Sequence, residues 1–146
     1  MWNFEASYKY GDFSLHDCSV TGIENNHGNI ILNFSDGYWI IESNPQNPYN
    51  KTIKTGASSL TLVNARCEDI IFGGKKFSWN DFIQNINSGK WSFECNAECY
   101  SDNRSVYLGF VCVGKAYYNP NPECHIWFTF QELIYNWNTI HKDRRW

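Results

Sequence analysis

The sequence lacks any segment that would place it in or across a membrane. No apolar run approaches the roughly 18 residues that span a bilayer. The first residues, Met1 to Lys9, contain neither a basic stretch nor a continuous apolar segment of the kind that begins a secretory signal. We therefore expect a cytoplasmic protein with no membrane partner.

Motifs for catalysis, cofactors and metals are also absent. The chain has no C-x-x-C pair and none of the patterns G-x-S-x-G, H-E-x-x-H and G-x-G-x-x-G, which mark nucleophile elbows, zinc proteases and dinucleotide sites. Residues 73–76, Gly-Gly-Lys-Lys, lack the spacer and the Ser or Thr of a P-loop. The sequence thus predicts no cofactor, no metal site and no catalytic residue, which favours a protein that is not an enzyme.

Only 4 Pro and 10 Gly occur in the 146 residues, whereas aromatic residues are plentiful. The 10 Phe, 9 Tyr and 7 Trp suffice to fill a core, so disorder is excluded. The chain also has 18 Asn, which favour turns over helix interiors. This composition, at a length near the commonest domain size, predicts one domain over residues 1–146, built mainly of short strands.

Basic residues are almost missing from the first third of the chain. Residues 1–50 contain six acids and one base, Lys9, for a charge of −5, whereas residues 51–146 carry +2 within the total of −3. Because phosphate binding needs a basic surface, this distribution argues against nucleic acid as the partner. It favours a basic protein partner instead.

Two groups of antiparallel strands are expected. In the first group, Asp36-Gly37 is a strong two-residue turn signal and predicts a hairpin that pairs Ser35 with Tyr38. A turn over residues 25–28 would join its first strand to an earlier strand near residues 13–24, which needs a bulge to keep its apolar residues on one face.

The second group is a meander with its first turn at Asp102-Asn103. This turn gives two strands that each have one apolar and one mixed face. A third strand follows after residue 122 and continues the pattern. The predicted inward residues are Phe93, Cys95, Ala97 and Cys99, then Val106, Leu108, Phe110 and Cys112, then Cys124, Ile126, Phe128 and Phe130.

Helical spacing occurs in two places. Ser78 and Asp81 have the spacing of a capped helix start, and the apolar residues that follow predict a short helix over residues 79–88. Residues 129–140 fit either a C-terminal helix or a continued strand. The predicted fold is mainly β, or α+β by strict count, with antiparallel meanders that form a sandwich or a partly closed barrel.

The six cysteines are expected to be structural. On a strand, Cys95 and Cys99 would lie roughly 13 Å apart, too far to share a zinc ion. In a reducing compartment, buried cysteines act as small apolar fillers. His16-Asp17 beside Cys18 is not expected to be a catalytic pair, because neighbours on a strand point to opposite faces, and a contact that stabilises a turn is expected there instead.

The mixed face of the second meander contains the candidate partner-binding site. Protein interfaces use aromatic rings as desolvated anchors and charges for steering. The alternative is that another element covers the two rings of this face as core. The candidate residues are Glu94, Glu98, Tyr107, His125 and Trp127.

A short acidic chain with Asn-rich and aromatic-rich strands, an early Leu15-His16-Asp17-Cys18 and a late Tyr135-Asn136-Trp137-Asn138 resembles small bacterial domains found among toxin immunity proteins. The resemblance implies a protein that binds and occludes a toxin. It assigns no functional residue.

We therefore predict a non-enzymatic cytoplasmic domain of the immunity type that occludes a basic partner, and the sequence indicates no oligomeric state. The alternative is a small-ligand or carbohydrate-binding β-barrel with an internal cavity walled by Trp39, Trp91 or Trp127. A third class, an enzyme, would need a cleft where the His16-Asp17 pair meets Cys18 or His125.

Overall fold

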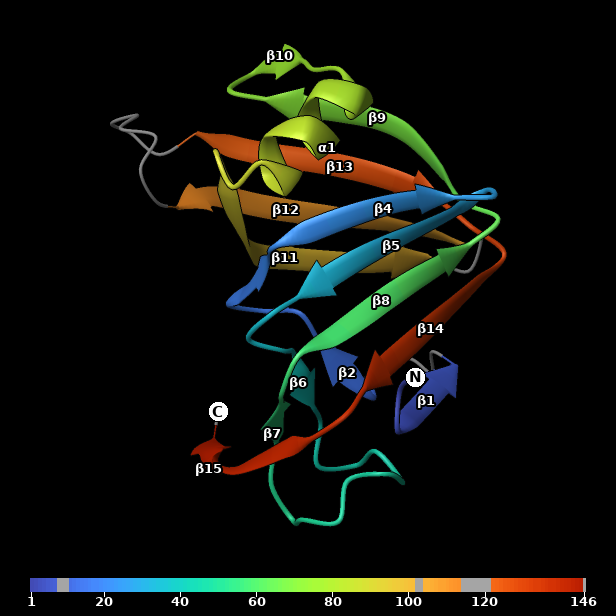
Figure 1. Ribbon diagram of the computed structural model, residues 1–146, viewed down its shortest axis with the longest axis vertical. Coiled ribbons are helices and arrows are strands. Elements are labelled where there is room, and N and C mark those ends of the chain that lie inside the picture. The colour runs from blue at the N-terminus through green and yellow to red at the C-terminus, as the bar shows by residue number, and fades with distance from the viewer. Residues whose placement is uncertain (8–10, 102–103, 114–121, 146) are drawn as a thin grey trace.

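The computed structural model describes residues 1–7, 11–101, 104–113 and 122–145. These residues form three antiparallel sheets and one helix, α1, in a sandwich-like α+β arrangement (Figure 1). The predicted mainly β fold with a short helix is therefore confirmed. Alternation of apolar and polar residues explains it, because each long strand has one face to bury.

The first sheet has five strands in the order β1, β14, β8, β5, β4. The predicted turn over residues 25–28 is confirmed, since β4 and β5 pair from Asn26 and Asn29 outward. At this turn His27 and Gly28 have φ values of 50° and 84°, as a tight two-residue hairpin requires. The strands span Phe4–Ser7 (β1), Glu132–Trp137 (β14), Ser58–Val63 (β8), Asn29–Phe34 (β5) and Gly22–Asn26 (β4).

The second sheet has six strands in the order β10, β9, β13, β12, β11, β3. Three adjacent strands, β11, β12 and β13, form the predicted second meander. Its register begins as predicted, with Phe93 opposite Cys112 and Cys95 opposite Phe110. The strands span Lys75–Lys76 (β10), Arg66–Phe72 (β9), Glu123–Thr129 (β13), Ser105–Val113 (β12), Ser92–Ser101 (β11) and Cys18–Val20 (β3).

A small third sheet lies at the lower end of Figure 1. It contains a buried lysine, Lys54. The Lys54 ammonium lies 3.1 Å from the carboxylate of Asp36 and 5.1 Å from the ring centroid of Trp39. The guanidinium of Arg144 also donates to Asp36 and holds the pKa of that carboxyl below its ordinary value. The strands span Ile140–Arg145 (β15), Ile53–Thr55 (β7), Trp39–Ile40 (β6) and Phe13–Ser14 (β2).

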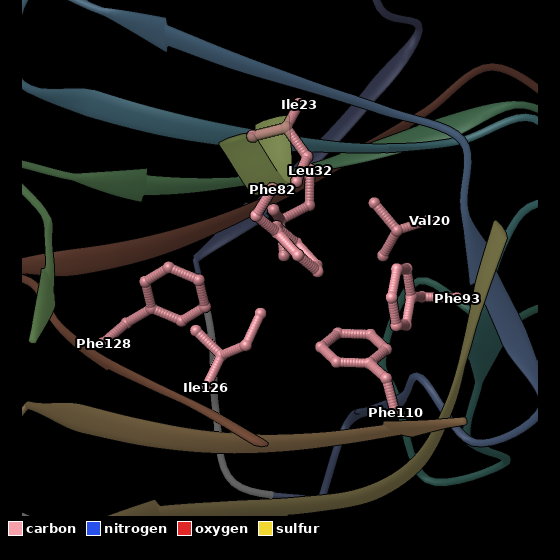
Figure 2. A pocket seen from close by; sticks show the side chains of 8 residues that line it. All are labelled: Val20, Ile23, Leu32, Phe82, Phe93, Phe110, Ile126 and Phe128. Atoms are coloured by element: carbon pink, nitrogen blue, oxygen red, sulfur yellow. The ribbon is translucent and has the colours of Figure 1, made fainter. Parts of the chain in front are cut away.

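The inward faces of the two large sheets meet in one core, and α1 (Trp79–Asn87) inserts Phe82 and Ile86 into it. The hydroxyl of Ser78 caps α1 by accepting the N–H of Asp81, as predicted. Figure 2 shows Phe82 among apolar side chains from both sheets, and the space between them does not admit a water molecule. This part of the interior is therefore filled and holds no ligand cavity of the kind the barrel alternative needs. The side chains drawn are Val20, Ile23, Leu32, Phe82, Phe93, Phe110, Ile126 and Phe128.

Amide side chains satisfy backbone groups at two edge strands. On β4, the side chain of Asn87 accepts the N–H of Ile23 and donates to its carbonyl, both at 2.7 Å. On β1, Gln46 donates to the carbonyl of Glu5 at 3.1 Å. Because unpaired strand edges recruit other strands, these contacts protect the five-stranded sheet from edge-to-edge association.

The predicted hairpin at Asp36-Gly37 is wrong. β5 pairs with β4 and β8, whereas β6 belongs to the small sheet, so the chain changes sheets at this point. The predicted strand near residues 13–24 is likewise divided among the three sheets, as β2, β3 and β4. The chain does turn at both places, with φ of 75° at Gly37 and 57° at Asp17. The strands on either side of each turn, however, pair with strands from elsewhere in the sequence and not with each other.

Of the two alternatives for residues 129–140, the C-terminal helix is wrong and the continued strand is confirmed, because the chain forms β14 and β15. The reason is the period of two along β14, where Leu133, Tyr135 and Trp137 are all buried. Tyr135 stacks on Phe13 with ring centroids 4.1 Å apart. A helix would carry these rings to different faces, so tertiary packing favours the strand.

Candidate functional site

The outward face of the six-stranded sheet brings three predicted site residues into contact. Tyr107 on β12 lies opposite Trp127 on β13, with ring centroids 5.3 Å apart. The Tyr107 and His125 rings stack at 5.8 Å and 15°, and the Tyr107 hydroxyl lies 2.7 Å from Nδ1 of His125. We call Tyr107, His125 and Trp127 the ring cluster.

The ring cluster is accessible to a partner. Trp127 is 37% exposed, and Tyr107 and His125 are partly exposed. No described element therefore covers Trp127 as core. Rings that already pack on one another lose little further rotational freedom on binding, which suits them to be interface anchors.

Gly109 on β12 makes room for the Tyr107 ring. It lies opposite His125 in the ladder, and a Cβ placed on it would fall 2.8 Å from the Tyr107 hydroxyl oxygen. Glycine inside a strand often marks such a close approach. The ring of Tyr107 thus occupies the space that a side chain at residue 109 would fill.

We expect Gly109→Ala to displace the Tyr107 ring and to break its contact with His125. Overpacking of this kind costs about 1–3 kcal/mol, which chemical denaturation would measure. The imidazole NMR signals of His125 report the lost contact. The matched control is the double variant Gly109→Ala with Tyr107→Phe, which removes the hydroxyl that the added Cβ would meet and should recover much of the lost stability. Unchanged His125 signals in Gly109→Ala would contradict this arrangement.

Carboxylates border the ring cluster. Oε2 of Glu123 lies 3.4 Å from Nε2 of His125, and the Glu123 side chain is largely exposed. Asp69 on β9 lies opposite Trp127, and its carboxylate lies 3.7 Å from the ammonium of Lys76. Glu94 on β11 is on the same outward side, because its neighbour Phe93 is buried on the inward side. The rings and these acids together form a face that attracts cationic groups.

Glu98 does not lie on this face, so that part of the predicted surface is wrong. The register of β11 shifts between Cys95 and Ala97, and this bulge turns the following residues over. Glu98 consequently pairs with the buried Leu108, and Cys99 takes the outward position opposite Tyr107.

Inside the sandwich, Glu98 links three elements. Its two carboxylate oxygens each accept the N–H of Leu15 at 3.2 Å, and Oε2 also accepts the Tyr100 hydroxyl at 3.0 Å. The Tyr100 hydroxyl lies 3.0 Å from that of Tyr135 on the opposite sheet. Burial raises the pKa of Glu98 above its ordinary value. Its role is therefore structural in this arrangement.

The cysteines are all free, and four of the six are buried among apolar side chains, as predicted for fillers. Cys18 on β3 lies opposite Cys95 on β11, a pairing that the sequence analysis did not find. Burial raises the pKa of Cys18 to about 12, so its thiol is protonated at neutral pH. The other two are Cys67, which is half-buried, and Cys99, which is exposed beside the ring cluster.

The predicted turn contact at His16-Asp17 is confirmed. Nδ1 of His16 lies 3.1 Å from the Asp17 carboxylate, and both side chains are well exposed. The thiol of Cys18 is fully buried and donates to the His16 carbonyl at 3.4 Å. A buried, protonated thiol is not an activated nucleophile, so this segment does not form a catalytic pair.

No protein-family model, curated protein or solved structure matches the chain. Among the residues that the structure describes, no group of three or more His, Cys, Asp or Glu could hold a metal ion. The described ranges also include no helix of the length and apolarity needed to cross a bilayer. The chain is thus characterised by its antiparallel three-sheet fold and by the ring cluster.

Proposed function

We propose that this chain is a non-enzymatic cytoplasmic binding protein that captures a basic protein on the outward face of its six-stranded sheet, as toxin immunity proteins occlude their toxins. The observation that carries the proposal is the ring cluster, three contacting rings on an open sheet face with carboxylates around them. Binding energy at interfaces concentrates in such aromatic anchors.

The face combines aromatic rings with carboxylates, the two kinds of group that recognise Lys or Arg side chains. One cationic group of the partner can lie over the exposed ring of Trp127, while others pair with Glu123 and Glu94 farther along the same face. The acidic first third of the chain adds long-range attraction for a basic partner, which raises the association rate. Steric occlusion then requires no chemistry from this chain.

The test is capture of a partner from the host by the tagged protein, with variants measured in parallel against the captured protein. Trp127→Ala should weaken binding by about 2 kcal/mol or more, roughly 30-fold, as removal of an anchor does. Glu94→Lys with Glu123→Lys should slow association and reduce its dependence on salt. Asp143→Lys is the matched control, an exposed acid on β15 that lies outside both this face and the acidic first third, and should keep the wild-type affinity.

Two results would reject the proposal. One is a captured protein that Trp127→Ala binds as tightly as the wild type does. The other is a partner with an acidic rather than a basic surface. Alkylation of Cys99 gives an independent readout, because a partner seated on the ring cluster should slow it. The background is the four buried thiols and the half-buried Cys67, whose pKa burial raises to about 12.

A further inference from the structure

A groove lies outside the sandwich, between α1 and the hairpin of β9 and β10. Its volume is about 640 Å³, within the range of small-molecule sites. It is separate from the ring cluster, because it is lined by α1 and by inward residues of the sheet. The lining residues are Phe72, Phe77, Asp81, Gln84, Asn85, Ser88, Lys90 and Trp91.

One wall of the groove is aromatic. The ring of Trp91 packs against Phe72 and Phe77, with centroid distances of 4.9 and 5.4 Å, and Phe72 lies 5.6 Å from Phe77. The backbone N–H of Trp91 donates to the Asn85 carbonyl at 3.1 Å, which ties this wall to the end of α1. The wall is therefore preformed. Phe72 and Phe77 provide most of its accessible ring surface, because Trp91 is only 8% exposed and the Lys90 ammonium lies 5.8 Å from its ring centroid.

The other wall is the polar stripe of α1. Asp81, Gln84, Asn85 and Ser88 follow one another at helical spacing, so they share one face of the helix. The amide of Asn85 donates to the Asp81 carbonyl at 2.8 Å, which leaves its oxygen available as an acceptor. Within the described residues, the Asp81 carboxylate and the Gln84 amide have no hydrogen-bond partner.

We propose that this groove binds a neutral saccharide. A pyranose ring presents an apolar C–H face, which packs on aromatic rings, and an edge of hydroxyls, which pair with carboxylates and amides. A purely apolar ligand would leave the polar stripe of α1 desolvated without partners. The single acid and single base of the lining, Asp81 and Lys90, favour no net charge on the ligand.

The test is a titration of the ¹⁵N-labelled protein, followed by NMR, with methyl β-D-glucopyranoside, methyl β-D-galactopyranoside and N-acetylglucosamine as probes. At least one sugar should give saturable shifts at the side-chain amides of Gln84 and Asn85 and at the indole N–H of Trp91. The sugar is raised to about 50 mM, well above a Kd of about 1 mM.

Gln84→Ala should weaken that binding at least about fivefold, roughly 1 kcal/mol, as loss of one hydrogen bond does. Asn80→Ala is the matched control on α1, an exposed residue outside the groove lining, and should bind as the wild type does. The absence of saturable shifts with all three sugars would overturn the proposal. So would equal affinity in Gln84→Ala, or binding of cyclohexanol as tight as that of the best sugar.

Discussion

Glu98→Ala is expected to destabilise the protein by roughly 2–4 kcal/mol, because it leaves buried donors without an acceptor. The N–H of Leu15 and the hydroxyl of Tyr100 both donate to this carboxylate. Tyr100 can still bond to Tyr135, but the Leu15 N–H would lose its side-chain acceptor on β11. Denaturation by urea at neutral pH measures the loss.

Glu98→Gln separates the charge of this group from its hydrogen bonds. The amide oxygen can still accept the Leu15 N–H, so the variant should fold with stability near that of the wild type or above it. Burial raises the pKa of Glu98, which means that the folded protein binds the proton more tightly than the unfolded chain does. The contribution of Glu98 to stability therefore falls as the pH rises above about 4, the ordinary value for glutamate.

The difference between Glu98→Gln and the wild type isolates this effect from all other carboxyl groups. Unfolding free energies measured from pH 4 to pH 7 should show the variant gaining on the wild type as the pH rises above about 4, until Glu98 is ionised in the folded protein as well. Alanine at Glu94, the outward glutamate of the same strand, is the control and should cost little. A difference that stays constant with pH would mean that folding leaves the pKa of Glu98 unchanged, and one that shrinks would mean that hydrogen bonds to the carboxylate outweigh its burial. Either result would contradict the prediction.

The position of Glu98 also shows where prediction from sequence reaches its limit. The first half of β11 is predictable, because Phe93 and Cys95 are apolar and alternate with polar residues. Beyond the bulge the small residues Ala97 and Cys99 fit either face, so the local pattern does not specify the register. What decides it is a set of polar contacts to Leu15 and Tyr135, which lie far away in the sequence.

The ring cluster could be found because β12 and β13 are regular over its length. Tyr107, His125 and Trp127 lie where simple alternation puts them, opposite the buried faces of their strands. The groove beside α1 was not foreseeable in the same way. Its polar stripe follows from the helical period, but its aromatic wall requires Trp91 to return from the end of α1 onto the β9–β10 hairpin.

Gly37→Ala is expected to cost more than about 4 kcal/mol, at the upper end of single substitutions, and to reduce soluble expression. Two effects combine at this position. The φ of 75° is unfavourable for a residue with a Cβ, and that Cβ would overlap the carbonyl oxygens of Thr55 and Gly56. These are backbone atoms of the β7 region, held in place by hydrogen bonds from Thr55 to Tyr38.

Gly74→Ala is the matched control, because it has the same backbone conformation without the crowding. Its φ is 77° and nothing lies within 4 Å of an added Cβ, so only the strain of roughly 1–2 kcal/mol is expected. Equal losses in urea denaturation of the two variants would mean that residue 37 needs glycine only for its φ, as an ordinary turn does. A much larger loss at Gly37 would show that glycine is required there for close packing against β7, where the chain passes from the five-stranded sheet into the small one.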